Sequence, residues 1–139
     1  MTQTHAQIKL TPQPIDVENV ISFVSHRDLA TSSYSSTSNR PRFVHNSPID
    51  TEAQAVMAKM ELDDIVLYAF EEFDINKIAI HYRIGSCTTD DIAVAFAISA
   101  KSKKESDLAC KAITTKLNGQ SENWNEKEFN SGINWIKSN

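Results

Sequence analysis

Lysines gather in one short stretch of the chain, between an apolar run and a segment with helical spacing. The string "KSKK" holds Lys101, Lys103 and Lys104, the densest positive charge in the sequence. Because the start of a helix offers free backbone N–H groups, lysines placed there would suit an anion. A solvated basic end of a strand is the more common origin of such a pattern, so the anion site is one of two interpretations.

Two other groups of residues could carry chemistry. Arg40 and Arg42 lie in a polar segment and could clamp an anion, although arginines in such segments are more often only solvated. Asp90 and Asp91 form a carboxylate pair in a turn, where solvated acids are commoner than an acid/base dyad. The sequence has no GxSxG or HExxH motif and only three glycines, which excludes a glycine-rich phosphate loop.

Length and charge indicate a single soluble domain. The 139 residues and 15.6 kDa fit one domain, over residues 1–139, that can bury a core without metals or disulfides. A net charge of −4 argues against broad binding of nucleic acid or anionic membranes. Cys87 and Cys110 lack metal-site spacing and are expected to be buried free thiols. No leader or spanning segment is evident, so we expect a cytoplasmic protein that binds no membrane.

Hydrophobic spacing predicts the elements that would position these residues. A short edge strand at Ile8 and Leu10 should end at Pro12 and Pro14. Further along the chain, the pattern predicts a helix capped by Asp16, a mobile loop over 31–47, a long helix over 51–73, strands over 77–85 and 91–101, and a helix over 103–119.

These elements define an α+β fold. The two long strands should pair antiparallel, in a mixed or antiparallel sheet with two main helices on one face. The second strand is apolar nearly throughout, as a strand covered on both faces would be. His81 and Tyr82 are interpreted as packing residues. The tail after Gly119 should dock through its apolar residues, which are Trp124, Phe129, Ile133, Trp135 and Ile136.

Several strings, in this order, resemble the large catalytic subunit of molybdopterin synthase, whose fold is an α/β-hammerhead. The resemblance runs weakly but continuously over about residues 8–137. It is carried by the strings "TEAQAVMAKMEL" (51–62), "HYRIG" (81–85), "AISAKSK" (97–103), "DLACKAI" (107–113), "ENWNEKEF" (122–129) and "GINWIK" (132–137). In the second string the match is at Arg83, Ile84 and Gly85.

The resemblance implies a function and a set of partners. Members of that family move sulfur from the C-terminal thiocarboxylate of a small ubiquitin-like subunit to cyclic pyranopterin monophosphate. The resemblance also implies a homodimer flanked by two such small subunits and a pterin substrate. It implies neither a metal nor another cofactor. Such chemistry needs cations to neutralise the substrate phosphate and to polarise an acyl-sulfur carbonyl.

Carried over by resemblance, the two family lysines fall on Asn118 and Asn125 of this chain. The nearby Lys116 and Lys127 are the candidate catalytic substitutes. The family's His-Arg pair falls on Lys101 and Ser102. The candidate substrate-binding residues are Arg40, Lys101, Ser102 and Arg83, with Arg40 taken as the nearest substitute for a loop arginine whose motif falls on Ser35 and Ser38.

Two functional hypotheses follow from this pattern. The chain is a molybdopterin synthase catalytic subunit whose neighbouring cations rebuild the site, or a catalytically degenerate relative that serves as a binding or regulatory partner. An asparagine supplies no charge and cannot act as a base near neutral pH. The charge of the groove where the Gly-Gly tail of the small subunit would end separates the two hypotheses. If Lys116 or Lys127 points into that groove, the enzyme hypothesis is favoured, whereas a neutral groove favours the binding partner.

Overall fold

The structure is a computed structural model that describes residues 5–37, 52–84 and 91–118. Within these residues, four strands form one sheet in the order β1-β3-β4-β2. The strands are β1 (Ala6–Thr11), β2 (Ala30–Thr37), β3 (Ile75–Arg83) and β4 (Ile92–Ala100). β1 runs parallel to β3, whereas β3 with β4 and β2 with β4 are antiparallel. The sheet is therefore mixed, which is one of the two arrangements that the sequence left open.

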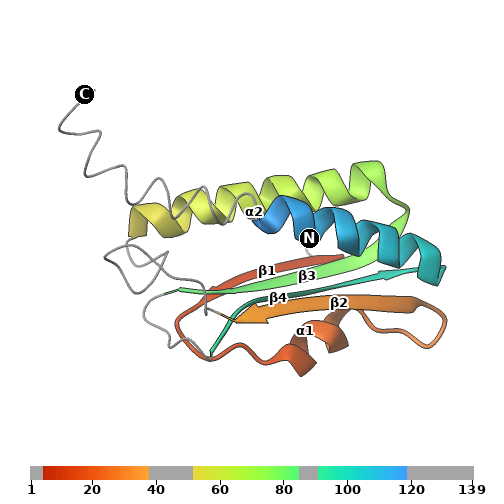
Figure 1. Cartoon of the computed structure of the whole chain (residues 1–139), viewed down its shortest axis with the longest axis horizontal. Coiled ribbons are helices and arrows are strands. Elements are labelled where there is room, and N and C mark those ends of the chain that lie inside the picture. The colour runs from red at the N-terminus through yellow and green to blue at the C-terminus, as the bar shows by residue number, and fades with distance from the viewer. Residues whose placement is uncertain (1–4, 38–51, 85–90, 119–139) are drawn as a thin grey trace.

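Three helices cover the two faces of this sheet (Figure 1). Helix α1 (Val17–Val24) lies on one face, and α2 (Glu52–Glu72) lies on the other. A third helix, over residues 103–118, lies beside α2. The prediction of two main helices on one face is confirmed. None of the described helices is long and apolar enough to cross a membrane.

Side-chain size differs between the two faces of the central strands, and this sets how closely the helices approach. Toward α2 and the 103–118 helix, β3 and β4 present large buried residues, namely Ile78, Ile80, Phe96 and Ile98. Toward α1 they present the small residues Ala79, Ala95 and Ala97, against which Val20 and Val24 pack. A short helix can therefore lie close to the sheet, and both faces of β4 are buried.

The prediction of a mobile loop over 31–47 is wrong for its first part. Residues up to Thr37 belong to β2, which pairs with β4 from Ala30 opposite Ala100 to Thr37 opposite Ile92. The strand is polar because it is an edge, with alternate side chains exposed, while Tyr34 packs on Phe96 at 5.6 Å between ring centroids. Residues 38–47, like the tail after Asn118, lie outside the described residues.

The helix α1 begins where its cap residue predicts. The Asp16 carboxylate accepts hydrogen bonds from the backbone N–H groups of Glu18 at 3.0 Å and Asn19 at 3.4 Å. These are donors that a helix start leaves without an intrahelical partner. The cap fixes α1 after β1, which ends at Thr11, just before the two prolines.

Removal of this cap is expected to lower stability measurably. We expect Asp16→Ala to reduce the free energy of unfolding by about 0.5–2 kcal/mol, because the Glu18 N–H group loses its acceptor and the Asn19 N–H group keeps only its bond to the Asp16 backbone oxygen. Urea titration followed by circular dichroism measures the change. Asp28→Ala, at an exposed carboxylate in the turn after α1, is the control and should change stability by less than about 0.5 kcal/mol. Equal effects of the two substitutions would contradict the role of Asp16.

Candidate functional site

The corner between β4 and the 103–118 helix carries two of the predicted substrate-binding residues. Lys101 and Ser102 follow directly after Ala100, and both are exposed. The Ser102 hydroxyl accepts a hydrogen bond from the backbone N–H of Glu105 at 3.1 Å, which is the geometry of a helix cap. Lys101 therefore stands immediately before a capped helix start, where a cation and free N–H groups can meet the same anion.

A cluster of polar side chains, which sequence reasoning missed, fastens this corner to β2. The Lys103 ammonium donates to the backbone oxygen of Thr31 at 3.1 Å and to the Ser32 hydroxyl at 3.3 Å, and lies 3.4 Å from the Asp107 carboxylate. Ser32 donates to the same carboxylate and lies 2.8 Å from the hydroxyl of Ser106. We call Ser32, Lys103, Ser106 and Asp107 the corner cluster.

The corner cluster lowers the pKa of its carboxylate. The hydrogen bond from Ser32 is the largest cause that holds the pKa of Asp107 below its ordinary value; partial desolvation opposes it, and the hydrogen bond and charge of Lys103 lower the pKa further. The group therefore contributes to stability at neutral pH and loses that contribution only in acid, as the pH falls through its folded pKa. One sequence signal existed: Ser106 stands on the apolar spacing of Ala109, Ile113 and Leu117, where a polar residue must find a buried partner.

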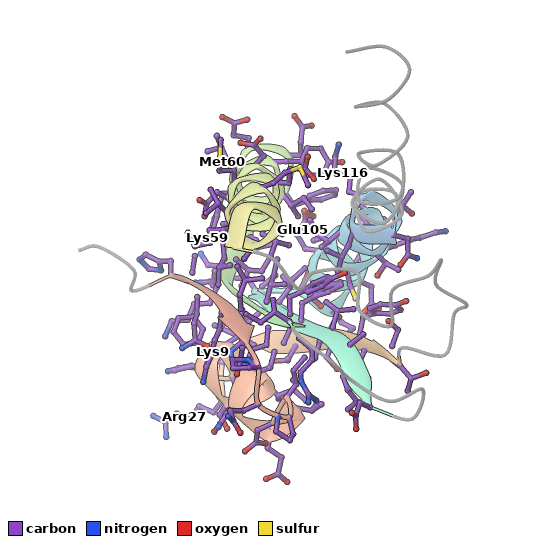
Figure 2. The ribbon with its side chains drawn as sticks, turned by 90° about the vertical axis from the view of Figure 1, so that its left-hand side faces the viewer. Lys9, Arg27, Lys59, Met60, Glu105 and Lys116 are labelled. Atoms are coloured by element: carbon purple, nitrogen blue, oxygen red, sulfur yellow. The ribbon has the colours of Figure 1, made fainter. Side chains whose placement is uncertain are left out.

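The last described turn of the same helix carries Lys116 and Asn118, a second group of residues singled out by the sequence analysis. Asn118 is half-buried there, and Lys116 is exposed. The Lys116 ammonium lies 4.4 Å from the ring centroid of Tyr68 on α2, a cation–π contact. Figure 2 shows Lys116 on the side of its helix that faces α2. A positive charge is therefore present within one turn of Asn118.

Arg83 lies at the end of β3, and its guanidinium is 3.6 Å from the carboxylate of Asp91. The Arg83 side chain is 11% exposed and that of Asp91 is 37% exposed, so the guanidinium is the more enclosed of the two groups. Asp91 therefore serves as a partner of Arg83 and not as part of an acid/base dyad. Asp90 itself lies outside the described residues, as do Arg40, Cys87, Asn125 and Lys127.

The fold places Lys101 far from two other predicted residues, Arg83 and Asn118. Lys101 follows the end of β4 that lies near the start of β3, since Ala100 pairs with Ile75. Arg83 lies at the opposite end of these nine-residue strands, which span about 30 Å. The 103–118 helix runs back along the sheet for about 24 Å, so Asn118 also lies far from Lys101 (Figure 1). Within one chain, the described residues therefore do not bring Lys101 close to Arg83 or to Asn118.

An open groove runs between the edge strand β1 and α2. It is lined by Ile8, Leu10, Ala55, Val56, Lys59 and Met60. Figure 2 shows Lys59 and Met60 on the side of α2 away from the third helix. The Lys59 ammonium is 3.1 Å from the Asp63 carboxylate, so the charge of this groove is largely balanced. Lys116 is not among its lining residues.

Two further titratable residues are partly or fully buried. Burial raises the pKa of the half-buried Cys110 thiol, which is a free cysteine and so stays protonated at neutral pH. His81 is 5% exposed and lies 2.7 Å from the Gln7 amide oxygen. Both His81 and Tyr82 are packed, as the sequence analysis expected.

Protonation of His81 is expected to destabilise the fold. Burial first, and then the charge of Lys9, lower the pKa of His81 below 6.5, while Asp16 acts in the opposite direction. Because the unfolded chain then binds the proton more readily, the free energy of unfolding should fall as the pH drops below about 6.5. Urea titrations between pH 5 and 8 test this. His81→Gln should flatten the profile, whereas His26→Gln, at an exposed histidine, should not.

Comparison with known proteins gives the family. The model of the MoaE protein family matches residues 10–118, which is most of the chain. The chain is also 26% identical over 123 residues to the molybdopterin synthase catalytic subunit of Arabidopsis thaliana, covering 87% of this chain. It spans only 62% of the length of that relative. The chain belongs to the MoaE protein family.

Solved structures show the same fold. The MoaE protein of Burkholderia ambifaria MC40-6 aligns with a TM-score of 0.64 at 19% identity, covering 81% of this chain and 76% of that one. A molybdopterin synthase from Staphylococcus aureus aligns with a TM-score of 0.58 at 20% identity, covering 84% and 83%. The predicted α+β fold and the predicted family are thereby confirmed.

Proposed function

We propose that this protein is a sulfur-transferring catalytic subunit of a molybdopterin synthase and acts in molybdenum cofactor biosynthesis in the cytoplasm. The observation that carries the proposal is the family match over residues 10–118. The likeness to a molybdopterin synthase catalytic subunit supports it. The substrate is then cyclic pyranopterin monophosphate, and the sulfur donor is the thiocarboxylated tail of a small ubiquitin-like partner.

In this proposal two cationic positions of the chain have different roles: one binds the substrate phosphate and the other polarises the acyl-sulfur carbonyl. Lys101, beside the capped helix start, would neutralise charge on the substrate phosphate, and the Ser102 hydroxyl would donate a hydrogen bond to it. Lys116, two positions before Asn118, would supply the charge that an acyl-sulfur carbonyl requires. Arg40 and Lys127 remain predicted contributors. Arg83 has the weaker case as a substrate ligand, because its guanidinium already pairs with Asp91.

Separation of the two positions supports a homodimer. Within one chain, Lys101 and Asn118 lie near opposite ends of a helix about 24 Å long. Two copies related by a two-fold axis could place the Lys101 end of one chain near the Asn118 end of the other, as isologous interfaces allow. We therefore propose that a complete site forms between two copies, and that each copy also binds one small partner.

A single-turnover assay tests the proposed function. The protein is mixed with a thiocarboxylated small subunit of a MoaE-family synthase and with cyclic pyranopterin monophosphate, and the sulfurated pterin is quantified by mass spectrometry. The same small subunit with an ordinary carboxylate is the control, since it has no sulfur to give. Binding of the small subunit is measured in parallel by calorimetry.

The outcomes separate the two hypotheses about this chain. Product that depends on the thiocarboxylate supports the proposal and shows that neighbouring cations replace the missing lysines. Binding of the small subunit without product would contradict the proposed activity. It would support the alternative, a catalytically degenerate homologue that binds the partner. Absence of both binding and product would contradict the synthase role altogether.

A further inference from the structure

We infer that the corner cluster holds the β4–helix corner in place for substrate binding, so that Ser32, Lys103, Ser106 and Asp107 are positioning residues. This inference rests on the proposed function, because the corner matters for sulfur transfer only if Lys101 and Ser102 contact the substrate. It changes the part assigned to Lys103. Of the three lysines in "KSKK", this one stabilises the corner instead of binding an anion.

The first step is the geometry of the Lys103 ammonium. An ammonium group has three N–H donors, and three acceptors surround this one. They are the Thr31 backbone oxygen at 3.1 Å, the Ser32 hydroxyl at 3.3 Å and the Asp107 carboxylate at 3.4 Å. The donors of Lys103 are therefore directed at the edge strand and at its own helix, although the side chain itself is 63% exposed.

The second step is the buried pair of hydroxyls beneath this ammonium. Ser106 is fully buried and Ser32 is 6% exposed, and their oxygens lie 2.8 Å apart. Ser106 also lies 3.1 Å from the Lys103 backbone oxygen, and Ser32 donates to Asp107. Each buried hydroxyl therefore has more than one partner inside the cluster, and a buried polar group that loses its partners is costly. Loss of one member disturbs the contacts of the others.

The third step is where the cluster lies in the chain. Lys103 follows Lys101 and Ser102 directly, so fixing the first turn of the helix also fixes these two residues. The anchor is β2, an edge strand that pairs with the sheet on one side only among the described strands. Residues that bind a substrate must be held within about 0.5 Å of their productive positions. The cluster supplies such a restraint between segments 71 to 75 positions apart in sequence.

Amine acylation measured by mass spectrometry tests the geometry without relying on activity. The native protein is treated briefly with an acetylating reagent, and modification is quantified at each lysine. Both Lys103 and Lys104 are exposed, but we expect Lys103 to react about fivefold more slowly, because its ammonium is hydrogen-bonded. In Asp107→Asn the two rates should approach each other. Thr115→Ala, which removes an exposed hydroxyl from the same helix, should leave the ratio unchanged.

Steady-state kinetics with a thiocarboxylated small subunit then separates positioning from stability. We expect Asp107→Asn to raise KM for the pterin substrate about tenfold with little change in kcat, because the corner would bind the substrate less well. A purely structural effect would lower the amount of active protein, and so the apparent kcat, at unchanged KM. Asp107 is used for this test because its side chain is 57% exposed. Substitution of the fully buried Ser106, as in Ser106→Ala, is more prone to prevent folding.

Each outcome decides the inference. Equal acylation of Lys103 and Lys104 in the wild-type protein would overturn it, as would release of Lys103 in Asp107→Asn with KM unchanged. A protected Lys103 in a wild-type protein that neither turns over nor binds the pterin would show that the proposed function has failed. The positioning role would be overturned with it, although the contacts themselves would stand. The inference is supported by three results together: slow acylation of Lys103 in the wild-type protein, faster acylation of Lys103 in Asp107→Asn, and a raised KM for the pterin in that variant.

Discussion

Replacing Asn118 with lysine is expected to raise the single-turnover rate of sulfur transfer by about 10²-fold. A lysine there would restore the cation that the family resemblance places at this position. Removal of one donor to a developing oxyanion costs about 10²–10³ in rate, and its return should regain a similar factor. Asn118 is half-buried on the same helix as the exposed Lys116, so a lysine there would place a second cation on this helix.

A matched variant distinguishes this position from charge in general. Thr115→Lys adds the same charge at an exposed site less than one turn earlier on the same helix. It should change the rate by less than about threefold, because an exposed charge is screened by solvent. If both variants accelerate the reaction equally, general electrostatic attraction explains the gain. If neither variant does, the assignment of Asn118 to the family lysine position is wrong.

Truncation of Phe96 is expected to have the largest effect on stability. Phe96 is fully buried in the central strand β4 and packs against Tyr34 of the edge strand. Phe96→Ala should lower the free energy of unfolding by about 3–5 kcal/mol, through lost apolar burial and the cavity that remains. Because a domain is usually stable by only about 5–15 kcal/mol, much of the folded population is at risk.

Urea denaturation gives the measurement and its control. Leu67→Ala removes a side chain of comparable hydrophobicity from the outer surface of α2, where it is 57% exposed. We expect a loss below about 0.5 kcal/mol for this variant. A loss below about 1 kcal/mol for Phe96→Ala would mean that the packing of β4 against β2 is much looser than the structure shows.

Most of the fold could be predicted from local pattern. The α2 segment has no glycine or proline and a long apolar repeat, and the β4 segment is apolar nearly throughout, so both were predicted close to their observed bounds. The strand β2 was missed because Ser and Thr dominate it, and such a composition is typical of loops. Its pairing with β4 is a tertiary effect that overrides local preference.

The candidate site could be predicted only in part. The types and order of Lys101, Ser102, Lys116 and Asn118 were readable from the sequence, because they follow one strand and span one helix. The corner cluster was not, since it joins Ser32 to Asp107 across 75 positions. In the string "KSKK" Lys103 looks solvated, yet its ammonium contacts three acceptors in the fold. Contacts of that kind depend on which strand forms the edge of the sheet.

The parallel pairing of β1 with β3 bears on how the chain folds during synthesis. Ala6 lies opposite Ile78, so the first strand must wait until residues 75–83 have left the ribosome before it can join the sheet. Closing so long a loop costs entropy before any contact compensates it, and topologies rich in such contacts fold slowly. The strand's apolar residues, Ile8 and Leu10, stay uncovered during that interval. The nascent chain therefore exposes this apolar strand to other chains until β3 has been synthesised.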